Sequence, residues 1–244
     1  MTRRRWLALT LCLAGLAGAA AAQSVTLDFG AGDGLTGRIV QLVLLVTLLS
    51  VAPSILIMAS SFVRIVVVLS LLRTAIGLQQ SPPNAVIVSL ALFLTAFIMA
   101  NPLQQSWEQG VRPMMNDEVT LEDGFNRAAA PIAAFMLTHT RQDDLAMFFD
   151  LAKIPPPATA AETPLNVLVP AFMISELKRA FEIGFLLFLP FLIIDLVVAS
   201  VLMSMGMMML PPVVVSLPFK LIFFVLVDGW SLVAGSLVQS YGGG

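Results

Sequence analysis

The sequence has few of the residues on which most catalytic and metal sites depend. It contains one cysteine, one histidine and one tyrosine, and only 11% of its residues are charged. Cys12 lies in an N-terminal segment that we expect to be cleaved, so the mature chain should lack disulfides, a thiol nucleophile and cysteine-based metal sites. We interpret His139 as an ordinary surface or helix-end histidine. The remaining ligands would be carboxylates, so we expect no metal and no cofactor.

Recognisable catalytic motifs are also missing. The sequence has no G-x-S-x-G, no H-E-x-x-H and no P-loop. Its paired acids, Asp143-Asp144 and Glu122-Asp123, are better explained as complements to helix dipoles. Asp195 and Asp228 could nominally form an intramembrane aspartyl pair, but Lys220 lies between them in sequence and no glycine-flanked signature accompanies them. We therefore expect no enzyme, and the net charge of −2 gives no reason to expect nucleic acid as a partner.

Hydrophobic residues are abundant, at 58% of the chain, against about 45–50% in soluble domains. They gather in four long runs, at residues 39–72, 85–103, 185–205 and 213–233. This pattern predicts an all-α integral membrane protein. We expect bent or kinked hydrophobic helical hairpins with a helical periplasmic insert between them.

The N-terminus has the pattern of a secretory signal peptide. Three arginines precede an apolar stretch, Trp6 to Gly18, which is followed by Ala20-Ala21-Ala22. We expect residues 1–22 to be cleaved between Ala22 and Gln23, and residues 23–36 to form a flexible periplasmic tail. A signal peptide on a multi-pass protein places the mature N-terminus outside the cytoplasm and indicates the bacterial inner membrane.

Residues 37–103 are expected to form the first hydrophobic hairpin. Its first run is longer than a hydrocarbon core of about 30 Å requires, so it either projects from the bilayer or breaks near Pro53. The second run is uncharged and reads as the most conventional span in the chain. Arg64 and Arg73 lie in the segment between these spans without an acidic residue, which favours a cytoplasmic location for that segment.

Residues 104–169 hold most of the charged residues and are expected to form the periplasmic helical insert. Short helices are predicted at 107–115 and at 123–138, the second reset by Pro131, and another begins near Thr140–Asp143. Residues 170–244 follow as a signature helix and a second hydrophobic hairpin with a methionine-rich tip. Within them, 170–184 forms an amphipathic segment that precedes the third run.

Asp195, Lys220 and Asp228 lie inside apolar runs. A charge at the bilayer centre costs at least about 2.5–3.5 kcal/mol, so such residues usually face protein or water. They could pair with one another or with another subunit, or they could form a proton or ion relay. We prefer the structural interpretation, because a relay needs a longer chain of titratable groups.

Met207, Met208 and Met209 directly precede Leu210 and a double proline. Loose core filling would explain scattered methionines, but three in a row at a hairpin tip are unusual. Thioether side chains adapt to irregular surfaces. Several copies around an axis could close a hole and still let a chain of varied sequence pass.

Several long motifs, in order along residues 37–240, resemble the FliP family, known as the SctR family in injectisomes. The resemblance is carried by RIVVVLSLLRTAIG (Arg64–Gly77), Pro82-Pro83-Asn84, LALFLT (Leu90–Thr95), FMLTHTRQDDLAMF (Phe135–Phe148), PAFMISELKRAFEIGF (Pro170–Phe185), IDLVVASVLMSMGMMMLPP (Ile194–Pro212) and SLPFKLIFFVLVDGW (Ser216–Trp230). The long periplasmic insert and the signal peptide favour the flagellar branch.

The resemblance implies a subunit of the flagellar type III protein export gate. Several copies would form a ring, of pentamer type, with FliQ-like and FliR-like subunits in the flagellar basal body, and would pass unfolded flagellar proteins across the inner membrane. The gasket that closes the lumen would be Met207, Met208 and Met209. Charges expected to be buried for subunit packing are Arg64, Arg73, Glu176, Lys178, Glu182, Asp195, Lys220 and Asp228.

Two other functions remain open from the residues alone. A small-solute or ion channel or transporter of the inner membrane would also carry charges inside apolar runs. A purely structural scaffold would tolerate alanine at the three methionines, whereas a gate would leak.

Overall fold

The computed structural model describes residues 35–78, 80–207 and 209–242, so the expected signal peptide, the cleavage site at Ala22 and Gln23, and most of the N-terminal tail lie outside the described residues. Every regular element in the described part is helical, which confirms the all-α prediction. The elements are α2 (Leu35–Met58), α3 (Phe62–Ile76), α4 (Asn84–Ile98), α5 (Ala100–Ser106), the π-helical turn η1 (Trp107–Val111), α6 (Arg112–Met115), α7 (Leu121–His139), α8 (Gln142–Ala152), the 3₁₀ turn η2 (Ala160–Glu162), α9 (Leu165–Ser204), α10 (Pro212–Leu226) and α11 (Gly229–Gly242).

The chain divides into two units, Met1–Ser50 and Val51–Gly244. In the described part of the first unit, α2 is regular, and Thr47 and Ser50 donate to the carbonyl oxygens of Val43 and Val46 at 2.7 Å. The helix continues through Pro53 and ends at Met58. The first hydrophobic run therefore breaks after Met58 and not near Pro53.

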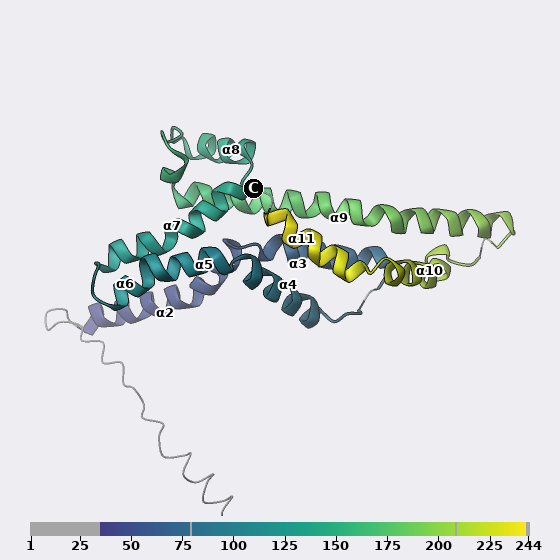
Figure 1. Ribbon diagram of the computed structural model, residues 1–244, viewed down its shortest axis with the longest axis horizontal. Helices are drawn as coiled ribbons and strands as arrows, with labels where there is room; N and C mark the ends of the chain where they lie inside the picture. Colours follow the sequence, from purple (N-terminus) through teal and green to yellow (C-terminus); the bar gives the residue numbers. More distant parts are fainter. Residues whose placement is uncertain (1–34, 79, 208, 243–244) are drawn as a thin grey trace, which may run out of the picture. The chain divides into compact units, whose positions relative to one another are not determined.

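The main core of the second unit forms where α3 packs against α9, with α4, α10 and α11 around them (Figure 1). One face of α3 is apolar at helical spacing, so it can be buried along its whole length. The helix stops at Gly77, whose φ of 93° is left-handed. The amide N–H groups of Gly77 and Leu78 donate to the carbonyl oxygens of Thr74 and Arg73 at 3.0 and 3.2 Å, the usual glycine-dependent helix end.

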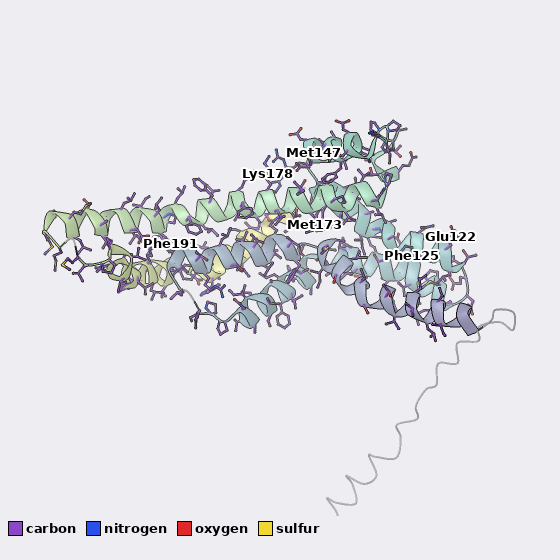
Figure 2. The ribbon with its side chains drawn as sticks, turned by 180° about the vertical axis from the view of Figure 1, so that it is seen from behind. Glu122, Phe125, Met147, Met173, Lys178 and Phe191 are labelled. Atoms are coloured by element: carbon purple, nitrogen blue, oxygen red, sulfur yellow. The ribbon has the colours of Figure 1, made fainter. Side chains whose placement is uncertain are left out.

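α9 is the longest element in the described residues, with 40 residues. The amphipathic segment and the third run, expected to be separate, are one helix that begins at Leu165, contains Pro170 and Pro190, and measures about 60 Å at 1.5 Å per residue. Phe191 lies on the side of α9 that packs into the core, and Lys178 lies on the opposite, exposed side (Figure 2). A proline costs one backbone bond, which neighbouring helices can offset inside a packed bundle.

The second and fourth runs lie in bent helix pairs, in agreement with the predicted bent or kinked hairpins. Asn84–Ile98 and Ala100–Met115 meet at 60°, and Pro212–Leu226 and Gly229–Gly242 meet at 61°. The first bend follows Ile98. Pro102 has no N–H to donate to the Ile98 carbonyl, and its ring would clash there, so α4 ends and α5 starts in a new direction. The second bend is at Asp228, whose φ of 50° ends the helical path between α10 and α11.

Among the described residues, α9 is long and apolar enough to cross a membrane, and up to three helical segments qualify if each bent pair counts as one span. The helices expected in the insert are present with shifted bounds. α7 runs unbroken through Pro131, so that proline does not reset it. α8 starts at Gln142 with Asp143 and Asp144 in its first turn, which confirms the predicted helix start.

Candidate functional site

One buried and one partly buried charged pair, together with one exposed turn, contain most of the residues singled out in the sequence. The first pair joins α3 to α9. The Arg64 Nε donates to Glu176 Oε2 at 2.9 Å, and its Nη2 donates to Glu176 Oε1. Both side chains are fully buried. A two-point pair of this kind fixes the relative position of two helices, and losing either partner would leave an uncompensated buried charge.

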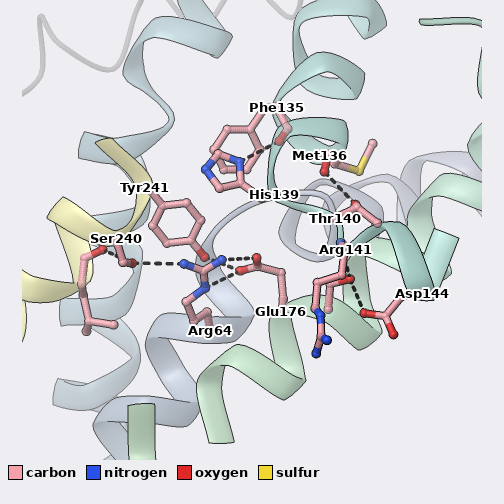
Figure 3. A network of polar contacts seen from close by, with 12 residues as sticks. Arg64, Phe135, Met136, His139, Thr140, Arg141, Asp144, Glu176, Ser240 and Tyr241 are labelled. Carbon is pink, nitrogen blue, oxygen red and sulfur yellow. Dashed lines mark hydrogen bonds and ion pairs between the residues drawn. The ribbon is translucent and has the colours of Figure 1, made fainter. Parts of the chain in front are cut away.

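The C-terminal end of α11 completes this pair (Figure 3). Ser240 Oγ accepts from Arg64 Nη1 at 3.1 Å. The Tyr241 ring lies 3.9 Å from the guanidinium carbon of Arg64, and its hydroxyl donates to Glu176 Oε2. An arginine over an aromatic face gains a cation–π attraction that is largest when water is excluded. Three helices distant in sequence, α3, α9 and α11, are therefore joined at one buried point.

His139 borders the same cluster. It is the last residue of α7, as a helix-end histidine would be, and its Nδ1 donates to the Phe135 carbonyl oxygen at 2.8 Å. Its ring lies 4.9 Å from the Tyr241 ring, which also stacks on Phe135 at 5.8 Å. Within the part of the chain that the structure describes, no three His, Cys, Asp or Glu side chains come together as a metal site would require.

A smaller polar contact ties α8 to α9. Ser175 Oγ donates to Asp144 Oδ2 at 2.7 Å and accepts from the Arg141 backbone N–H at 3.0 Å. Arg141 also approaches Asp143 and Glu182 at 3.7 and 4.0 Å on the surface. The buried serine fixes the start of α8, whereas the exposed ion pairs contribute little because water screens them.

The second pair joins α9 to α10, with Lys220 buried and Asp195 half-buried. Lys220 Nζ lies 2.7 Å from Asp195 Oδ2 and donates to the Ala75 carbonyl oxygen at 3.4 Å. Ser216 Oγ donates to Asp195 Oδ1 at 2.5 Å. Of the alternatives left open by the sequence, pairing within the chain therefore holds for Asp195 and Lys220. An aspartyl pair does not form, because Asp195 faces a lysine and Asp228 forms the α10–α11 turn.

The other expected charges are not buried within one chain. Arg73 is half-buried and donates to Asn84 Oδ1 at 2.5 Å and the Pro82 carbonyl oxygen at 3.3 Å. Lys178, Glu182 and Asp228 are exposed. Arg64 and Arg73 both lie within α3, and the cytoplasmic location that they favour for this segment stays a prediction.

The exposed turn lies where α9 meets α10, and we call it the methionine turn, Met203 to Leu210. Gly206 has a φ of 73°. The N–H groups of Gly206 and Met207 donate back to the carbonyls of Met203 and Leu202 at 3.1 and 3.0 Å, and this ends α9. α10 then begins at Pro212, directly after the extended Pro211. Met207 and Met209 project from the turn, while Met208 lies outside the described residues.

Ser240 and Tyr241 were not predicted from the sequence to take part in a site. Ser175 and Ser216 were also missed, because a serine inside an apolar run gives no signal until its partner is known. One signal was available, since Tyr241 is the only tyrosine in the chain.

Comparison with known proteins gives a consistent result. The FliP family model matches residues 45–237. A flagellar biosynthetic protein FliP of Caulobacter vibrioides is 65% identical over 235 residues, covering 96% of this chain and 88% of the relative. Proteins with the same description from Bacillus subtilis and Aquifex aeolicus are 55% and 50% identical, covering 83% and 92% of this chain and 91% and 95% of those relatives.

Proposed function

The chain belongs to the FliP family, and from this we propose that it is a subunit of the flagellar type III protein export gate. Copies of it form a ring-shaped channel, of pentamer type, with FliQ-like and FliR-like subunits in the basal body. The channel passes unfolded flagellar proteins across the bacterial inner membrane. The observation that carries the proposal is the family match across most of the chain, to relatives described as flagellar biosynthetic proteins.

The exposed apolar surface supports a place among other chains or lipid. Large hydrophobic side chains are exposed along the second half of α9 and on α10, including Leu192, Ile193, Leu196, Val213 and Val214. A soluble monomer rarely exposes a contiguous apolar surface of more than a few hundred Å². Helices of a multi-pass subunit can place these side chains against lipid or against neighbouring copies.

The methionine turn supports the closing role. Met207 and Met209 are exposed at a tip that carries no charged side chain. We propose that Met207, Met208 and Met209 of the several copies meet at the axis and form the gasket. Their flexible thioethers close the lumen in the resting state and yield to a passing polypeptide.

The charges divide into two groups in this proposal. Arg64 with Glu176, and Asp195 with Lys220, hold each subunit's own helices in place for packing into the ring. Arg73, Lys178, Glu182 and Asp228 remain available for neighbouring subunits. The signal peptide, cleaved between Ala22 and Gln23, places residues 23–36 and the insert at 104–169 in the periplasm.

A small-solute or ion channel or transporter is the second candidate, and the partly buried Asp195–Lys220 pair between apolar helices favours it. Such a protein would bind its solute as a purified single chain. An export gate would instead copurify with two smaller hydrophobic partners, and cells lacking it would be non-motile and without filaments.

Native mass measurement of the complex extracted in detergent tests the proposal. A gate subunit gives several copies of this chain together with the partner chains. A particle that contains one copy alone would refute the ring.

A further inference from the structure

α11 is fastened to the rest of its unit at both ends. At its start, the Trp230 ring meets the Phe224 ring of α10 edge-on, with the ring centroids 5.4 Å apart. At its far end, Ser240 accepts a hydrogen bond from the buried ion pair between α3 and α9, and Tyr241 covers that pair and donates to it (Figure 3). Both fastenings lie within one chain, so they do not depend on how copies of the chain assemble.

Between these two ends, α11 is thinly packed against α9. A hollow of about 360 Å³ has Ile183 and Leu187 of α9 and Leu232 and Leu237 of α11 among its lining residues. A second hollow, of about 240 Å³, adjoins it near the bend and shares Leu187 and Leu232. Side chains that border a hollow lose the dispersion contacts of the missing atoms. Packing on α9 therefore contributes little to holding α11 in place.

The burial of whole helices shows the same contrast. α11 buries three of its 14 residues, Gly229, Val233 and Leu237. α3, which forms the centre of the core, buries seven of its 15 residues. Elements with few buried apolar contacts open at a lower free energy than the core does. α11 is thus able to open while α3 stays packed.

We propose that α11 is a releasable strap, clasped at its far end by Ser240 and Tyr241, which detaches from α9 and returns while α3 and α9 remain packed together. The tyrosine hydroxyl is the main part of the clasp, because it donates to the Glu176 carboxylate, and hydrogen bonds to charged groups are the strong ones. Release uncovers the apolar side chains of α9 that line the hollow, so the clasp controls access to that face.

The residue that precedes Glu176 provides an internal control. Ser175 is also fully buried, and it binds Asp144 and the backbone N–H of Arg141 at the start of α8. α8 also buries little, with Phe149 as its buried residue. Successive side chains on a helix point about 100° apart. The two adjacent residues therefore hold two different helices, and the contacts of one can be removed while those of the other stay in place.

Hydrogen–deuterium exchange tests whether α11 opens separately. The full chain is extracted in detergent with the chains that accompany it, and exchange is followed for the backbone amides of each helix. In the native chain, the amides of α11 should exchange at least about tenfold faster than those of α3. If α11 exchanges as slowly as α3, it opens only when the whole unit unfolds, and the proposal is overturned. This outcome is independent of the proposed gate function.

Two single variants test the clasp itself. Tyr241→Phe should raise exchange in α11 by at least about tenfold, the value of a hydrogen bond to a charged group, and leave α8 unchanged. Ser175→Ala should raise exchange in α8 and leave α11 unchanged. Ser240→Ala is the milder variant of the clasp and should raise exchange in α11 by a smaller factor. The proposal is overturned if α11 is indifferent to both clasp variants, or if either variant speeds α8 and α11 equally.

Discussion

α9 carries two regions of opposite character. Near its N-terminal end, Glu176 is buried in a network with Arg64 and Tyr241 that joins α3, α9 and α11. At its C-terminal end, the methionine turn is apolar and exposed. Soluble proteins commonly show the reverse, with charges outside and apolar groups inside. The N-terminal part of α9 is thus held in place by polar contacts within the chain. The methionine turn at the other end has apolar side chains free to contact other chains or lipid.

The largest expected effect is at the anchored end. Changing Arg64 to alanine would leave the Glu176 carboxylate buried without its partner and should cost about 3–5 kcal/mol in free energy of unfolding. The yield of folded protein and its thermal unfolding in detergent would report this. A double variant with Arg64→Met and Glu176→Leu removes both charges and should recover much of the loss. A double variant no better than the single one would contradict an electrostatic cause.

The bend between α10 and α11 supports the anchored end from a distance, because it directs α11 towards Arg64. A Cβ on Gly229 would lie 2.1 Å from the Phe224 ring, so Gly229→Ala should cost about 1–3 kcal/mol. Gly235 is the matched control, since a Cβ there meets no atom within 4 Å. Thermal unfolding of both variants should separate them, and equal midpoints would show that the bend is not tightly packed.

A finer test concerns the Tyr241 hydroxyl. Tyr241→Phe keeps the ring over Arg64 and removes one hydrogen bond to a buried carboxylate, so the expected loss is about 1.5–3 kcal/mol at most. Tyr241→Ala also removes the stacking on Phe135 and should be clearly less stable than the phenylalanine variant. If the two variants unfold at the same temperature, the ring does not contribute to the anchor.

The smallest effect is expected at the exposed end. Met209→Leu changes a side chain that is almost wholly exposed, and such surface changes are usually within about 0.5 kcal/mol. Thermal unfolding of this variant should match that of the native chain. A marked loss of stability would mean that the turn is held by contacts within the chain, and the contrast between the two ends would disappear.

Sequence reasoning reached the helical class, the family and the importance of the charged residues, because hydrophobic runs and long motifs are local signals. The positions at which helices end or bend were predicted less well. Pro131 was expected to reset its helix and a break near Pro53 was one of two alternatives, yet both helices continue through these prolines. Pro102, which ends α4, was not considered. A proline's effect depends on whether neighbouring groups can offset the lost bond, which is a property of packing.

Only the charged members of the two polar networks could be recognised from the sequence, because the identity of their partners depends on the packing of the helices. Arg64, Glu176, Asp195 and Lys220 stand out because charge is rare in apolar runs. Their partners Tyr241, Ser240 and Ser216 do not stand out in the sequence. Tyr241 lies more than sixty positions from Glu176, and Ser216, which binds Asp195, is an ordinary serine inside an apolar run. The close approach of Gly229 to Phe224 likewise depends on the bend, which the continuous apolar pattern from 213 to 233 conceals.

The most direct test of the proposed gasket is the permeability of the inner membrane in cells that express this chain with alanine at Met207, Met208 and Met209. Alanine keeps the turn apolar but removes the bulk that would close a lumen, while the anchor at Arg64 is untouched. If the three methionines close a lumen, the variant accumulates normally and the leakage of ions or small molecules clearly rises. Normal accumulation with unchanged permeability would contradict the proposed gasket.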